Sequence, residues 1–64
     1  MNRLKVVNKY SEEIDIVFVN HIATIYTERD DIIIRMDNGH RIYTTFKSLD
    51  EALDAVDRVI GATV

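Results

Sequence analysis

The 64-residue sequence contains no cysteine, no proline and no tryptophan, and only two glycines. Without cysteine the chain can form neither a disulfide nor a thiolate metal site. Its two histidines are too few for a structural zinc site unless carboxylates complete the ligand set. A domain this small usually needs a disulfide, a metal or a second subunit in addition to its own core. We therefore expect a homo-oligomer that uses no cofactor.

The charge is mildly acidic, with a formal net charge of −3 at pH 7. This balance argues against general affinity for nucleic acid or for an anionic membrane surface. Apolar residues make up 47% of the chain and charged residues 30%, which is typical of a folded globular domain. No apolar run approaches the length of a membrane span, and residues 1–5 lack the apolar core of a signal peptide. We expect a soluble, cytoplasmic protein.

Short runs rich in β-branched residues predict strands over about residues 4–9, 14–19, 22–28, 31–37 and 40–46. Short polar connections between them favour an antiparallel meander. A helix is predicted over about 49–60, because Ser48 and Glu51 match a capping box and Leu49, Leu53 and Val56 recur at helical spacing. Gly61 is placed to end it. The predicted fold is α+β: a single domain, residues 1–64, with a four- to five-stranded antiparallel β-meander and one C-terminal α-helix packed on one face.

Asn38-Gly39 is a strong signal for a two-residue hairpin turn of type I′. That turn would place Met36 opposite Arg41 and Ile34 opposite Tyr43. Because side chains alternate along a strand, a second apolar row would then point to the other face of the sheet. One short helix covers only part of one face, so we expect this second row to meet another protein surface. The interface candidates are Val17, Val19, Ile33, Ile42 and Phe46.

Catalytic chemistry is not expected from these residues. Asp37 and His40 flank the turn and would lie together across the hairpin, as an acid–base pair, a weak metal site or, in the interpretation we favour, a surface cross-strand pair. His21 has no predictable partner. No serine or lysine has an activating neighbour, and no glycine-rich phosphate loop is present. The sequence therefore predicts neither an enzyme nor a metal centre.

Two other functions remain open. A nucleic-acid-binding regulator would need its basic residues to converge, and the candidates are Arg3, Lys5, Arg35 and Arg41. A small-ligand or nucleotide-binding oligomer would hold its ligand in a pocket between subunits. The residues that would line this pocket are Tyr26, Tyr43, Arg35 and His40. Packing in a core or interface is the default for both tyrosines, since each has an apolar body and a polar tip.

From Ile14 to about residue 62 the chain resembles the small flagellar FlbD/SwrD family. The matching features are a strand ending in Val19-Asn20, the run Ile32-Ile33-Ile34-Arg35-Met36, Asn38-Gly39, and Ser48 opening an acidic helix. The sequence departs where that family places Asn-Pro, because His21 follows Asn20. The same pattern also resembles part of LytTR-type DNA-binding domains, which are larger, and small bacteriophage-encoded regulators. We expect a non-catalytic interaction or regulatory module that binds itself and another protein or, as a phage product, inhibits a host protein in the host cytoplasm.

Overall fold

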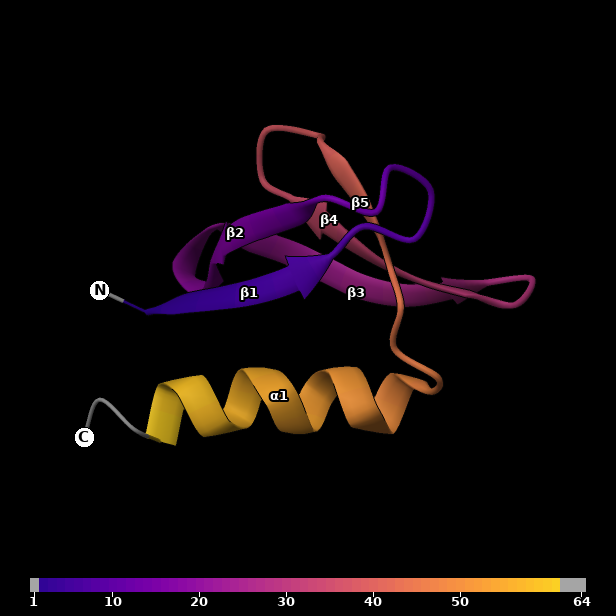
Figure 1. Cartoon of the computed structure of the whole chain (residues 1–64). Coiled ribbons are helices and arrows are strands. Elements are labelled where there is room, and N and C mark those ends of the chain that lie inside the picture. The colour runs from indigo at the N-terminus through magenta and orange to yellow at the C-terminus, as the bar shows by residue number, and fades with distance from the viewer. Residues whose placement is uncertain (1, 62–64) are drawn as a thin grey trace.

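The fold is described by a computed structural model over residues 2–61. The elements in chain order are β1 (Arg3–Val7), β2 (Ile14–Phe18), the 3-10 helix η1 (Val19–His21), β3 (Ile22–Glu28), β4 (Asp31–Met36), β5 (Arg41–Thr44) and α1 (Leu49–Gly61). All strands are antiparallel to their neighbours, and the single α-helix follows them. The predicted α+β class is confirmed, and the element ends lie within about two residues of their expected positions (Figure 1).

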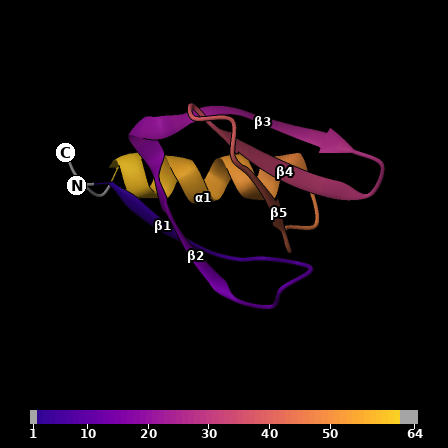
Figure 2. The ribbon, with the colours of Figure 1, turned by 90° about the horizontal axis from the view of Figure 1, so that it is seen from above.

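The strands form two sheets rather than one continuous meander. β1 and β2 make a two-stranded ribbon, and β3, β4 and β5 make a three-stranded sheet. The two sheets meet at one isolated bridge between Asn8 and Thr44, next to a hydrogen bond of 2.7 Å from the Lys9 N–H to the Tyr43 carbonyl. β2 and β3 do not pair with each other, and η1 joins them across the two sheets. Seen from above, the ribbon and the sheet diverge (Figure 2), and α1 runs below the strands (Figure 1).

The core lies between the ribbon and the sheet. Val6 and Val17 from the ribbon pack with Ile34 and Ile42 from the sheet, and all four are buried. Partly buried side chains surround this cluster: Leu4, Ile22, Ile25, Met36 and Phe46. The ribbon thus covers one apolar face of the three-stranded sheet. The β1–β2 ribbon is therefore a second layer that covers the sheet, in addition to the helix. This second layer was not predicted from the sequence.

The predicted register of the β4–β5 hairpin is wrong by one residue. Ile34 lies opposite Ile42, not Tyr43, and Arg35 lies opposite Arg41. The loop contains three residues, 37–39, because the Gly39 N–H donates to the Met36 carbonyl (3.0 Å) and only Gly39 has a positive φ, of 88°. A type I′ turn would require a positive φ at Asn38 as well. The one-residue change turns Ile42 toward Ile34 and into the core.

The helix begins at the predicted cap. The Ser48 hydroxyl accepts from the Glu51 N–H at 3.1 Å, whereas the Glu51 carboxylate accepts from the Lys47 N–H at 3.3 Å rather than from Ser48. α1 packs against β1, β3 and η1, and Ala52 is its fully buried residue. Leu53, expected in the buried stripe, is 42% exposed. Gly61 is the last helical residue and has no positive φ.

No helix within residues 2–61 has the length and apolar character that crossing a membrane requires.

Candidate interaction surface

The outer edge of β2 is unpaired in the described part of the chain. At the two ends of the ribbon, the Asn8 N–H donates to the Glu13 carbonyl (2.8 Å) and the Val19 N–H donates to the Asn2 carbonyl (2.9 Å). Hydrogen-bonded pairs alternate along an antiparallel ladder, so the odd-numbered residues of β2 bond to β1. The backbone groups of the even-numbered residues therefore point away from β1, to the free edge. These residues are Ile14, Ile16 and Phe18.

The side chains of the same three residues form an exposed apolar row. Ile14 is 62% exposed, Ile16 is 47% exposed and Phe18 is 39% exposed. They occupy alternate positions of one strand and so lie on one face of the ribbon. Unpaired strand edges and large exposed apolar side chains are both features that monomeric proteins usually avoid. At β2 the two features coincide on the same three residues.

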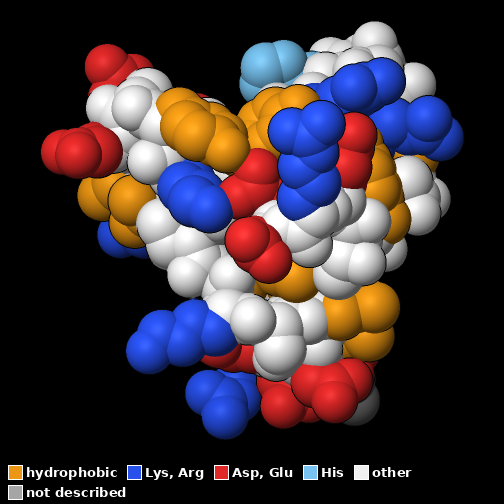
Figure 3. Space-filling view, turned by 90° about the vertical axis from the view of Figure 1, so that its right-hand side faces the viewer, with side chains coloured by type: hydrophobic (Ala, Val, Ile, Leu, Met, Phe, Trp, Pro, Cys, Tyr) orange, Lys and Arg blue, Asp and Glu red, His pale blue; other side chains and the backbone are white. Residues whose placement is uncertain are grey.

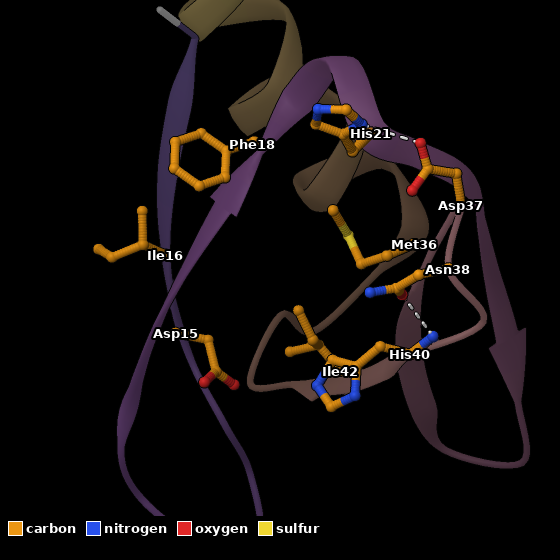
Figure 4. A pocket seen from close by; sticks show the side chains of 9 residues that line it. All are labelled: Asp15, Ile16, Phe18, His21, Met36, Asp37, Asn38, His40 and Ile42. Carbon is orange, nitrogen blue, oxygen red and sulfur yellow. Dashed lines mark hydrogen bonds and ion pairs between the residues drawn. The ribbon is translucent and has the colours of Figure 1, made fainter.

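A pocket of about 400 Å³ lies between β2 and the β4–β5 loop. Met36 and Ile42 supply its apolar interior, and Asp15, His21 and His40 supply polar groups (Figure 4). The complete lining is Asp15, Ile16, Phe18, His21, Met36, Asp37, Asn38, His40 and Ile42. Because Ile16 and Phe18 belong to both the lining and the unpaired edge, the pocket is continuous with the edge of β2.

The histidines are arranged differently from the expectation. Asp37 pairs with His21, with 2.9 Å between the carboxylate Oδ2 and the ring Nδ1, and not with His40. The His40 backbone N–H instead donates to the Asn38 side-chain oxygen at 2.9 Å. Both side chains of the His21–Asp37 pair are more than half exposed, so the pair is worth at most about 1 kcal/mol. In residues 2–61 no three acidic or histidine side chains are grouped so that they could hold a metal ion.

Three of the five interface candidates lie inside a single chain. Val17 is 1% exposed, Ile33 is 0% exposed and Ile42 is 4% exposed, while Val19 and Phe46 are half-buried. The first three therefore present no surface to a partner in this structure. Exposed apolar residues are found instead on β2, on the face opposite to Val17. The sequence of β2 shows that its side chains alternate between two faces. Only the packing of the ribbon on the sheet shows that the face of Val17 is buried and that the other face remains exposed.

A second polar cluster ties the β1–β2 connection to β4. The Tyr10 hydroxyl donates to Asp31 at 2.7 Å, the Lys9 ammonium also pairs with Asp31, and the Tyr10 ring meets Tyr43 edge-on at 5.3 Å. The hydrogen bonds from Lys9 and Tyr10 lower the pKa of Asp31 below its ordinary value. The bond to Asp31 in turn raises the pKa values of Lys9 and Tyr10. Sequence reasoning missed this cluster because Lys9 and Tyr10 lie more than twenty residues from Asp31 in the chain.

Four of the candidate ligand and nucleic-acid residues share one face of the three-stranded sheet, and the other three lie elsewhere. Arg35 and Arg41 are paired on the three-stranded sheet, and Tyr26 and Tyr43 flank Ile33 on the same face. His40 lines the pocket instead. The remaining basic candidates, Arg3 and Lys5, lie on β1 in the other sheet. On the side of the molecule that carries the β3–β4 connection, acidic and basic side chains are mixed rather than forming a surface of one sign (Figure 3).

No protein-family model, curated protein or solved structure matches this chain. The resemblance to the FlbD/SwrD family and to phage regulators stays a prediction that rests on the residues quoted for it.

Proposed function

We propose that this chain is a non-catalytic protein-interaction module that assembles with a second copy of itself through the free edge of β2. The observation that carries the proposal is the coincidence, on Ile14, Ile16 and Phe18, of outward-pointing backbone groups and exposed apolar side chains. An antiparallel partner strand would satisfy the backbone groups and cover part of the side chains. A domain of 64 residues also benefits from the additional buried surface.

The edge is self-complementary about one two-fold register. With Ile16 opposite Ile16 of the second copy, the five residues of β2 overlap completely. Ile14 then lies opposite Phe18 of the second copy, so the apolar row continues across the interface. Asp15 lies opposite Val17 of the second copy, so the two Asp15 carboxylates are diagonal neighbours on one face and are not directly opposed. Centring the pair on Asp15 would oppose two carboxylates, which is destabilising.

The pocket takes part in the same arrangement. An added strand places alternate side chains on the two faces of the sheet, and those opposite Val17 point to the pocket side. In the proposed register this residue is Asp15 of the second copy. Its carboxylate would approach a pocket lining that carries His21 and His40, which can donate to it, and also Asp15 and Asp37 of the first copy, whose like charge opposes it. This mixed lining makes the pocket a weak contributor to affinity.

The association is expected to be weak. Full burial of an Ile or Phe side chain stabilises by about 1.5–3 kcal/mol, but these three are already between one-third and two-thirds buried. Association itself costs about 4–15 kcal/mol in lost translational and rotational freedom. Because the gain from burial and this cost are of similar size, we expect a weak dimer, with a Kd in the micromolar to millimolar range (about 4–8 kcal/mol).

Sedimentation equilibrium over about 10 µM to 1 mM protein tests the proposal, because this range brackets the expected Kd. Ile16→Pro removes an N–H that points to the free edge, not one that bonds to β1, so it should abolish dimerisation while the folded monomer remains. Leu53→Lys is the matched control, since Leu53 is a similarly exposed apolar residue on α1. A monomeric wild type at 1 mM, or an Ile16→Pro variant that dimerises like the wild type, would contradict the proposal. Circular dichroism establishes that each variant is folded.

A further inference from the structure

Two arginines face each other across the β4–β5 hairpin. Arg35 and Arg41 are directly opposed in the register, and both are exposed. The Met36 N–H donates to the His40 carbonyl at 2.8 Å, so that neighbouring pair is hydrogen-bonded. Because pair types alternate, Arg35 and Arg41 form a non-hydrogen-bonded pair, in which the Cα atoms are only about 4.5 Å apart and the side chains are closest. Like charges in such a position are destabilising.

No salt bridge within residues 2–61 reaches either arginine of this pair. Among the described residues Lys9 pairs with Asp31 and His21 with Asp37, and the guanidinium groups of Arg35 and Arg41 form no side-chain hydrogen bond or salt bridge. Asp31 shares the strand and the face of Arg35, but four residues separate them, which is about 13 Å along a strand. Asp31 is also already held by Lys9 and Tyr10. The protein thus places two arginines at directly opposed positions with no salt bridge to either guanidinium group within residues 2–61, although its net charge is negative.

We infer that Arg35 and Arg41 form a binding site for a phosphoryl group, an inference independent of the self-association at β2. A guanidinium presents a planar fork of N–H donors that matches phosphate oxygens two at a time. Two such forks that rise from adjacent positions of a sheet contact one dianion together, and the bound charge removes their mutual repulsion. The shared chemistry is a phosphate monoester or inorganic phosphate.

Tyr43 distinguishes the two sources of that phosphate. It lies two residues from Arg41 on the same face of β5, and its ring is partly exposed. A ring at this distance can stack on the base of a nucleotide whose phosphate contacts the arginines. A nucleoside monophosphate should then bind more tightly than inorganic phosphate, and the difference should depend on Tyr43.

The experiment is a titration of the ¹⁵N-labelled protein with inorganic phosphate and, separately, with AMP, at ionic strength held constant with sodium chloride. The amide signals of β4 and β5 near Arg35 and Arg41 should shift with saturation, and Arg35→Gln and Arg41→Gln should each weaken binding at least tenfold. Arg58→Gln, which changes an exposed arginine of α1, is the charge-matched control and should bind like the wild type. Tenfold tighter binding of AMP than of phosphate, lost in Tyr43→Leu, assigns a nucleotide. Equal binding of the two assigns the phosphate group alone.

The melting temperature gives a second readout, first without ligand and then with phosphate. Removing one of two opposed like charges should raise the melting temperature of Arg35→Gln and Arg41→Gln at low salt, and phosphate should raise that of the wild type but not of these variants. The inference is overturned if phosphate and AMP produce no more shift than chloride, or if Arg58→Gln weakens binding as much as Arg35→Gln does.

Discussion

Shortening Ile42 to valine should destabilise the monomer itself. Ile42 is 4% exposed and packs with Val6, Val17 and Ile34 between the ribbon and the sheet. Removing one buried methylene from such a site costs about 0.5–1.5 kcal/mol, because the neighbours only partly fill the space it leaves. For a domain of this size, 1 kcal/mol lowers the melting temperature by about 4–8 °C, so the expected decrease is about 2–12 °C.

The assay is urea unfolding of wild type and Ile42→Val, each at a low and a high protein concentration. Ile16→Val is the control, since the same methylene is lost from a side chain that is 47% exposed and the cost should stay below about 0.5 kcal/mol. The destabilisation by Ile42→Val should be the same at both concentrations, because the contacts it weakens lie within one chain. A loss that appears only at the high concentration would place Ile42 in an interface, and equal losses at the two positions would contradict the described core.

Three further predictions concern the β4–β5 turn, the helix cap and the stability of the protein at acidic pH. Gly39→Ala should cost about 1 kcal/mol in chemical unfolding, because φ is 88° there although the added Cβ meets no atom within 4 Å; a neutral result would contradict the three-residue loop. Ser48→Ala should lower the free energy of unfolding by about 0.5–2 kcal/mol and reduce the helical circular dichroism signal, since the Glu51 N–H loses its capping acceptor. Ser11→Ala should not reduce helicity. The pKa of Asp31 is lower in the folded state than its ordinary value, so its contribution to stability is present above pH 4 and is lost as the pH falls through the folded-state pKa. Asp31→Asn should flatten the decrease in stability below about pH 4, Asp30→Asn should not, and identical curves for the two variants would contradict the cluster.

Local patterns were sufficient to predict the elements of this fold. Apolar alternation located the strands, and Ser48 with Glu51 located the start of α1, because both signals depend on residues close together in the chain. The hairpin register was not predictable in the same way. Asn38-Gly39 is compatible with a two- or a three-residue loop, and the choice depends on whether Asp37 joins the turn, which packing of the flanking strands decides.

The sequence could not show, for the same reason, that Val17, Ile33 and Ile42 of the expected docking face are buried within one chain. The sequence shows two apolar rows around Ile34 and Ile33 but not that the chain folds its first two strands back over the sheet. That packing depends on contacts between residues as distant as Val6 and Ile42, which no local pattern encodes. The ribbon covers the row around Ile34, and Ile33 on the other face is fully buried between Tyr26 and Tyr43, so the exposed row is the one on β2. The expectation of an interacting surface is kept, and its position moves to Ile14, Ile16 and Phe18.

Amide hydrogen exchange of β2, measured by NMR as a function of protein concentration, tests the self-association most directly. At low concentration the amides of Asp15 and Val17 should be protected by their bonds to β1, and those of Ile14, Ile16 and Phe18 should exchange rapidly. At high concentration the account predicts that protection of the Ile16 amide rises while that of Val17 stays nearly unchanged. An Ile16 amide that exchanges equally fast at every concentration would contradict strand pairing at this edge.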